Sequence, residues 1–155
     1  MGNNQFINRA IELATQNVTE NGGPFGAVIV KNGEIIAEGV NRVSASNDPT
    51  AHAEVQAIRE ACRKLNTFEL KGCEIYTSCE PCPMCFSAIY WARLDCVYFA
   101  ASHSDAAKAG FDDAFIYDEI KLKIEERKVR FIELMHEKRI APFDEWKKFE
   151  GKVDY

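Results

Sequence analysis

The N-terminal part of the chain switches from one hydrophobic period to another. Over residues 6–18 apolar side chains recur at helical spacing, which predicts an amphipathic helix that ends at the glycines that follow. Two apolar runs, 27–30 and 34–40, then flank Asn32 and Gly33, residues that accept the positive φ of a tight turn. The pattern predicts a helix followed by a β-hairpin.

Helical and strand patterns alternate through the rest of the chain, without repeats or a linker long enough to divide it. In order, we predict a loop at 40–50, a helix at 52–64, a strand at 73–78, a helix that begins near Pro81 and runs through Ala92, a strand at 96–101, a short helix at 114–120, a strand at 129–135 and a helix from about Pro142. Short apolar strands that alternate with helices are typical of an α/β sheet covered on both faces. A chain of 155 residues fits one such domain.

Composition and charge restrict the class of protein. A hydrophobic fraction of 46% with 28% charged residues is typical of a soluble globular chain. No apolar run reaches the roughly 18 residues of a transmembrane helix, and the N-terminus lacks the pattern of a signal peptide, so we expect a cytoplasmic protein with no membrane partner. The formal net charge of -5 argues against nucleic acid as the main partner, because phosphate binding requires clustered Lys and Arg.

Three candidate metal ligands lie at the starts of two predicted helices. His52 begins the helix at 52–64, and Cys82 and Cys85, about one helical turn apart, begin the next helix. Helix N-termini favour the thiolate form of cysteine, which is the form that binds zinc. One imidazole and two thiolates leave the fourth tetrahedral position to water, as in catalytic zinc sites, and zinc lowers the pKa of that water to about 7. Glu54 can then move a proton of the bound water.

Other interpretations of these residues are open at this point. Cys79 as a fourth ligand would close a structural zinc site, but Glu54 would then have no role. The pair in CPMC also fits a thioredoxin-like redox motif, although that motif does not explain HAE. In a third interpretation the histidine caps a helix, the glutamate faces water and the cysteines are small core residues. A disulfide framework is disfavoured because the core is large and the compartment reducing. Packing in apolar patterns explains the remaining cysteines, Cys62, Cys73 and Cys96.

The motifs HAE and PCPMC together resemble the signature of the zinc-dependent cytidine and nucleobase deaminases. The similarity extends over most of the chain, through GGPFGAVIV, NDPTAHAEVQAIR and TSCEPCPMCFSAIYWAR, and with AGFDDAFIY it points to the bacterial guanine deaminases. The resemblance implies a three-layer α/β/α fold with a central mixed sheet of about five strands. It also implies Zn2+ on His52, Cys82 and Cys85, with Glu54 as the catalytic proton shuttle.

For such an enzyme the expected substrate is a small purine base, and the expected reaction is hydrolysis of guanine to xanthine and ammonia. The resemblance implies that Asn41 binds the edge of the base and that Phe25 lines the flat slot for the purine ring. It also implies that Asp113 accepts a hydrogen bond from the exocyclic amine. The resemblance also implies a homodimer whose C-terminal segment, about 142–155, covers the active site, with Tyr155 over the bound base. Taken alone, Asn41, Phe25 and Tyr155 fit better as a turn asparagine, a core phenylalanine and part of a frayed terminus, and Asp113 also fits a solvated loop; the neighbouring family motifs favour the binding roles.

Other functions share the same zinc chemistry. A tRNA adenosine deaminase must also bind a phosphate backbone, which the negative net charge of this chain disfavours. Cytosine and guanosine stay open as substrates because the zinc machinery does not specify the ring. A zinc-stabilised interaction module would keep metal and fold without turnover. His103 and His136 lack partner motifs, so we expect surface or packing roles for them, and we expect Trp91 in the core.

Overall fold

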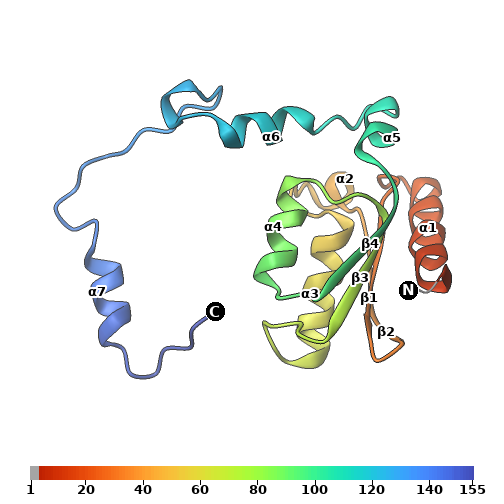
Figure 1. Ribbon diagram of the computed structural model, residues 1–155, viewed down its shortest axis with the longest axis horizontal. Coiled ribbons are helices and arrows are strands. Elements are labelled where there is room, and N and C mark those ends of the chain that lie inside the picture. Colours follow the sequence, from red (N-terminus) through yellow and green to blue (C-terminus); the bar gives the residue numbers. More distant parts are fainter. Residues whose placement is uncertain (1–3) are drawn as a thin grey trace. The chain divides into compact units, whose positions relative to one another are not determined.

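The structure is a computed structural model that describes residues 4–155 (Figure 1). These residues form two compact units, which divide between Ile116 and Tyr117, within helix α6 (Ala114–Lys121). Among the described residues no helix is both long and apolar enough to cross a membrane. Each unit is described separately below.

A mixed four-stranded sheet forms the centre of the first unit. Its order is β2-β1-β3-β4, with β1 antiparallel to β2 and β3, and β3 parallel to β4. The strands are β1 (Gly26–Lys31), β2 (Glu34–Val40), β3 (Cys73–Cys79) and β4 (Cys96–Ala101). Between β1 and β2, Asn32 and Gly33 have φ values of 52° and 80°, which confirms the predicted hairpin turn.

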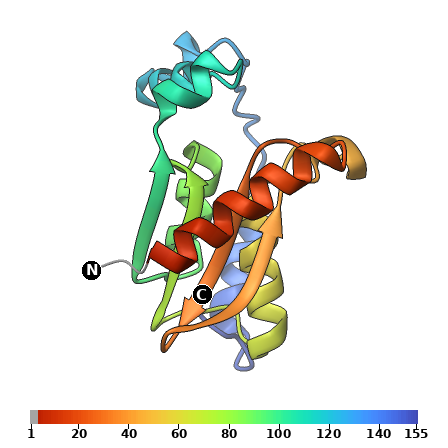
Figure 2. The same cartoon turned by 90° about the vertical axis from the view of Figure 1, so that its right-hand side faces the viewer.

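Helices cover both faces of this sheet. Helix α1 (Asn4–Thr19) packs on one face, where it crosses the strands in Figure 2. Helices α3 (Ala53–Leu65) and α4 (Pro83–Trp91) pack on the other face. The three-layer α/β/α arrangement is therefore confirmed.

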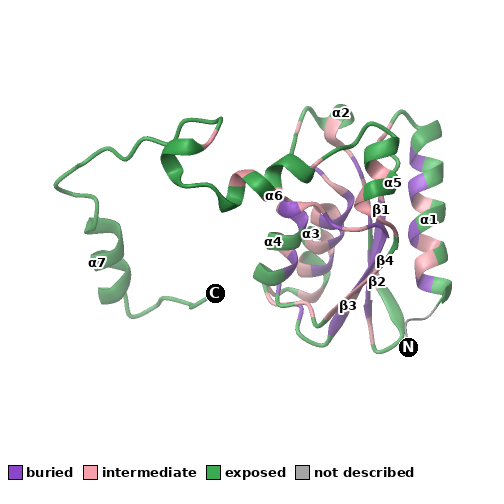
Figure 3. Ribbon diagram, turned by 45° about the horizontal axis from the view of Figure 1, so that its top comes forward, coloured by how far each residue is buried: buried purple, intermediate pink, exposed green. Residues whose placement is uncertain are grey.

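The core consists of two buried clusters, one on each face of the sheet. Successive β1 side chains alternate between them because strand side chains point to opposite faces. Ala27 and Ile29 pack with the alanines of α3, whereas Val28 and Val30 pack with Phe6 of α1. Buried residues accordingly line both sides of the sheet in Figure 3.

Two short helices lie in stretches that the hydrophobic pattern leaves as loops. They are α2 (Val43–Ser46) and α5 (His103–Lys108). A capping box starts α5: the Ser102 hydroxyl accepts from the Asp105 N–H, and the Asp105 carboxylate accepts from the Ser102 N–H. The signal for α5 is thus a Ser and an Asp three residues apart, rather than an apolar face.

The prediction that Trp91 lies in the core is wrong, because its side chain is 63% exposed. Helix α4 directs Cys85 and Ile89 inward, and both are buried. Trp91 follows Ile89 by two residues, which places it on the opposite side of the helix. Phe86 and Tyr90 share this outer surface, at 51% and 66% exposure.

The second unit, Tyr117–Tyr155, contains the end of α6, a short 3₁₀ helix (Ile124–Glu126) and α7 (Ala141–Lys148). None of its side chains is buried. The short helix predicted at 114–120 and the last helix from about Pro142 are confirmed by α6 and α7.

The predicted strand at 129–135 is wrong: this stretch pairs with no strand among the described residues, and the sheet has four strands rather than about five. Its apolar positions come partly as adjacent pairs, Phe131 with Ile132 and Leu134 with Met135. Adjacent residues point to opposite faces of a strand, so the stretch does not give one clean apolar face.

Candidate metal centre and base pocket

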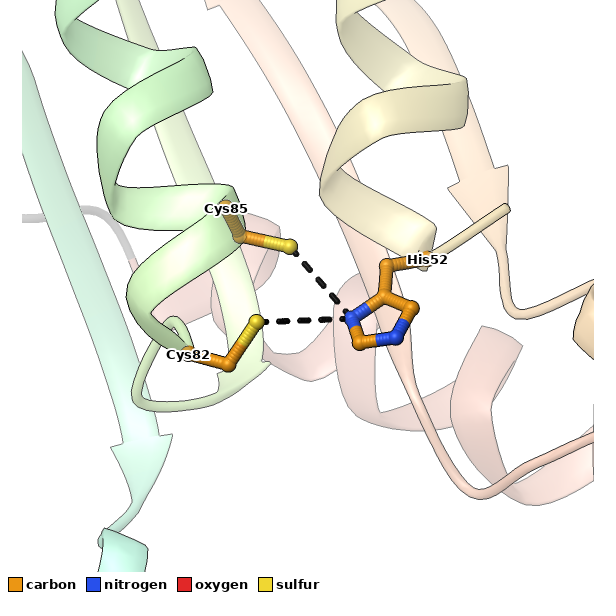
Figure 4. A group of neighbouring side chains, drawn as sticks. All are labelled: His52, Cys82 and Cys85. Atoms are coloured by element: carbon orange, nitrogen blue, oxygen red, sulfur yellow. Dashed lines mark hydrogen bonds between the residues drawn. The ribbon is translucent and has the colours of Figure 1, made fainter. Parts of the chain in front are cut away.

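The three predicted metal ligands come together at the N-termini of two neighbouring helices. His52 is the N-cap of α3 and Cys82 the N-cap of α4, both in extended backbone conformation, with ψ of 156° and 168°. Neither side chain makes a capping hydrogen bond, and both point toward the space between the two helix ends in Figure 4. Pro83 then begins α4, where its missing N–H costs no helical bond.

The ligand atoms have the spacing of a metal site (Figure 4). His52 Nδ1 lies 3.5 Å from Cys82 Sγ and 3.5 Å from Cys85 Sγ, and the three atoms are all within 4.8 Å of one another. Tetrahedral zinc, with Zn–S of about 2.3 Å and Zn–N of about 2.0 Å, separates nitrogen from sulfur by about 3.5 Å. The donor set and its spacing therefore fit zinc.

Cys79 does not join this group among the described residues. Its thiol donates instead to the Ser102 carbonyl at 3.7 Å, and burial raises its pKa to about 11. All six cysteines are free thiols. Three protein ligands leave an open coordination position, as in catalytic rather than structural zinc sites.

The two ligand cysteines differ in protonation. A hydrogen bond from the Cys85 thiol, assisted by His52, lowers the pKa of Cys82 to about 4 despite partial burial. The same hydrogen bond and complete burial raise the pKa of Cys85. The Cys82 sulfur in turn raises the pKa of His52. These contacts favour the thiolate at Cys82 and the thiol at Cys85, so a metal bound here would require Cys85 to lose its proton.

Glu54 lies in the first turn of α3, next to the ligands, and is only 7% exposed. Burial raises the pKa of its carboxyl group. A buried carboxylate with a raised pKa exchanges protons more readily near neutral pH than a solvated one. Glu54 lines the same cavity as His52 and Cys82, which suits a proton carrier.

The cavity over the ligands has a volume of about 460 Å³, within the range of small-molecule sites. Predicted residues Phe25, Asn41 and Asp113 all line it. The rings of Phe25 and Phe111 meet edge to face, with centroids 5.0 Å apart, and form an apolar wall. Phe111 was not among the predicted residues; its only signal is an aromatic side chain beside the aspartate pair.

Asn41 lines this cavity, and its side-chain amide has a defined orientation. The side-chain oxygen accepts from the Val43 N–H at 3.2 Å, which fixes the orientation of the amide. The backbone of Asn41 is held as well, because its carbonyl accepts from the buried Asn17 side chain at 2.9 Å. An amide held in this way keeps its NH2 group as a hydrogen-bond donor.

His103 is brought into the cavity wall, contrary to the expected surface or packing role. Its Nδ1 is 3.2 Å from Asp113 Oδ1, and its Nε2 is 3.5 Å from Glu80 Oε1. Both carboxylates also line the cavity. Neither Glu80, which lies inside the quoted TSCEPCPMC stretch, nor His103 was predicted as a site residue. The available signal was their position, because Glu80 directly follows β3 and His103 lies two residues after the end of β4.

Tyr155 belongs to the second unit, where its ring meets the edge of Trp146 with centroids 6.3 Å apart. The aromatic residues of α7 and its end, Phe143, Trp146 and Phe149, are 64%, 40% and 60% exposed. The role of Tyr155 over a bound base stays a prediction.

The family described as the cytidine and deoxycytidylate deaminase zinc-binding region matches residues 2–101. This match covers most of the chain and contains every predicted zinc ligand and Glu54. The chain therefore belongs to this family of zinc-binding deaminases.

Within this family, the chain is similar to guanine deaminases, and to one of them along its full length. The chain is 55% identical to the guanine deaminase of Bacillus subtilis (strain 168) over the full length of both proteins. The X-ray structure of guanine deaminase from B. subtilis superposes with a TM-score of 0.97 over 100% of this chain and 99% of that one. The structure of a guanine deaminase from Nitrosomonas europaea superposes with a TM-score of 0.67 and 36% sequence identity. This superposition covers 70% of this chain and 63% of that one.

A tRNA-specific adenosine deaminase of Aquifex aeolicus (strain VF5) is also similar. It is 48% identical over 101 residues, which are 65% of this chain and 67% of that protein. This similarity is partial, whereas the similarity to the B. subtilis guanine deaminase includes residues beyond 101 and the whole second unit.

Proposed function

We propose that this chain is a zinc-dependent guanine deaminase that converts guanine and water to xanthine and ammonia. The observation that carries the proposal is one cavity lined by His52, Cys82, the buried Glu54 and Asn41, with the Cys85 sulfur beside the first two. The full-length similarity to a guanine deaminase supports guanine over other bases.

His52, Cys82 and Cys85 would hold the zinc, whose contribution when bound is to lower the pKa of water to about 7. Glu54 takes a proton from the water whose oxygen adds to C2 of guanine, and delivers that proton to N3. Asp113 accepts a hydrogen bond from the exocyclic amine and helps carry the second proton of the water, from the oxygen now bonded to C2, to the departing amino nitrogen. The C2–N bond then breaks as the C2=O bond forms, which releases ammonia and leaves xanthine.

The remaining cavity residues bind and orient the base in this proposal. The Asn41 NH2 group donates to an acceptor on the base edge, and guanine offers such acceptors at O6 and N7. Phe25 packs against the flat ring, which holds C2 over the metal centre and displaces bulk water.

A substrate panel tests the proposal. The zinc-loaded protein is incubated with guanine, guanosine, adenine, cytosine and cytidine, and ammonia is followed. We expect release from guanine above all others; release from none of them would contradict an enzyme and favour a zinc-stabilised interaction module.

The ligand assignment has its own test. His52→Ala and Cys85→Ala should each lose zinc as well as turnover, because each removes one of three protein ligands. Cys79→Ala is the matched control and should keep stoichiometric zinc. An active Cys85→Ala protein with full zinc content would refute the assignment.

We also propose that residues 1–155 act as one deaminase domain, in which segment 142–155, with Tyr155, covers the bound base. The protein would be a homodimer in the cytoplasm. Helix α4 supports the dimer: it has no charged residue, and Phe86, Tyr90 and Trp91 are exposed on it. Aromatic side chains without charges are typical of interface centres. The six free thiols support a reducing compartment. Sedimentation equilibrium should give a mass of two chains, and a single-chain mass would contradict the dimer.

A further inference from the structure

One group in the cavity wall has no part in the mechanism above. The imidazole of His103 lies between two carboxylates, with Nδ1 at 3.2 Å from Asp113 and Nε2 at 3.5 Å from Glu80. We propose that His103 is a positioning residue that orients the Asp113 carboxylate toward the base, an inference that rests on the proposed function.

Asp113 depends on His103 for its orientation. It lies in the connection between α5 and α6, and among the described residues no other side chain forms an ion pair or hydrogen bond with its carboxylate. The neighbouring Asp112 is occupied differently, because its carboxylate accepts from the Ala114 N–H at 3.0 Å. Without the imidazole, Asp113 keeps its place in the chain but loses this side-chain contact, in which Nδ1 lies 3.2 Å from its carboxylate.

The sheet holds the other side of His103. Cys79 pairs with Ala101 at the carboxyl ends of the parallel strands β3 and β4, and the Glu80 N–H donates to the Ala101 carbonyl at 2.9 Å. The Glu80 carboxylate then accepts from the backbone N–H of His103 at 3.2 Å. The imidazole is thus anchored to the rigid strand ends from which the zinc ligands of α4 also follow.

The two ring nitrogens make separable contributions. A proton on Nδ1 lets His103 donate to Asp113, whereas Nε2 faces Glu80. In a variant, the asparagine amide nitrogen occupies about the place of Nδ1, and the glutamine amide nitrogen about the place of Nε2. His103→Asn therefore preserves the contact with Asp113, and His103→Gln preserves the contact with Glu80.

Turnover of guanine by these two variants is the first measurement. We expect His103→Asn to keep kcat within about threefold of wild type. We expect His103→Gln to lose about 10- to 100-fold in kcat with a smaller change in KM, since a displaced proton carrier impairs the chemical step more than binding. Zinc content and circular dichroism should match wild type in both variants, which separates positioning from loss of fold.

A double-mutant cycle tests whether His103 acts through Asp113. In an Asp113→Ala background, His103→Gln should cause no further loss, because the group that it positions is already absent. Losses that multiply would overturn the inference, as would equal turnover by the Asn and Gln variants.

A spectroscopic measurement is independent of catalysis. In 15N NMR of the zinc-loaded wild type, Nδ1 of His103 should carry a proton, and its signal should shift in Asp113→Ala. The His103→Asn spectrum assigns the resonance. An unprotonated Nδ1 would overturn the inference. If the wild type releases no ammonia from guanine, the proposed function is wrong and this spectrum alone decides the role of His103.

Discussion

Glu54 carries the largest catalytic effect expected of any single side chain outside the metal ligands. Glu54→Gln preserves shape and removes the proton carrier, so kcat should fall by about 100-fold or more while zinc content and fold stay unchanged. The matched control is Glu60→Gln on the same helix, a partly exposed residue that forms ion pairs with Arg63 and Lys64 and should keep wild-type turnover. Guanine turnover by Glu54→Gln near the wild-type rate would remove Glu54 from the mechanism.

The cysteines give a second prediction at this scale. In metal-free protein at pH 6, Cys82 is above its pKa of about 4 and is a thiolate, whereas burial raises the pKa of the similarly half-buried Cys62, which stays a thiol. Iodoacetamide should therefore modify Cys82 well before Cys62, and bound zinc should protect Cys82. Peptide mass spectrometry measures both sites, and equal rates at the two would contradict the assigned thiolate.

At the scale of elements, Gly39 permits the close approach of β2 and α3. A Cβ at Gly39 would clash with the Ala53 carbonyl and lie 2.5 Å from the Ala57 nitrogen, both backbone atoms of α3. Gly39→Ala should therefore lower the free energy of unfolding by about 2 kcal/mol or more, and should weaken zinc binding because the ligand His52 is the N-cap of α3.

Chemical denaturation and zinc titration measure both effects. Glu38→Ala, the neighbouring change, removes an ion pair with Arg9 that is largely exposed, and should cost about 1 kcal/mol or less. A Gly39→Ala protein as stable as wild type would mean that α3 can shift without affecting the site.

At the scale of the whole molecule, the C-terminal tail is expected to serve the active site. Deletion of residues 152–155 should leave zinc content and circular dichroism unchanged and should lower guanine turnover, because Tyr155 no longer covers the base. Lys152→Ala is the control for the tail and should behave as wild type. A truncated protein with full turnover would show that the tail has no catalytic role.

The sequence determined most of the fold through local patterns. The helical spacing of apolar residues over 6–18 predicts α1, and Asn32 with Gly33 predicts the hairpin turn. The motifs HAE and PCPMC together predict the metal centre. Each prediction rests on neighbouring residues or on a known pair of motifs. The stretch 129–135 has strand-like composition but forms no strand, because a strand also needs a partner that its own residues do not supply.

Only the tertiary structure decided the second set of groups around the cavity. Glu80 and His103 become neighbours because β3 and β4 are parallel and adjacent, a pairing that sequence spacing does not encode. Trp91 is apolar in sequence but exposed, because the direction of α4 is set by Cys85 and Ile89. Local patterns and motifs therefore determined most of the helices and strands and the three zinc ligands, whereas long-range packing decided that Glu80 and His103 line the cavity, since it alone brings distant residues into contact.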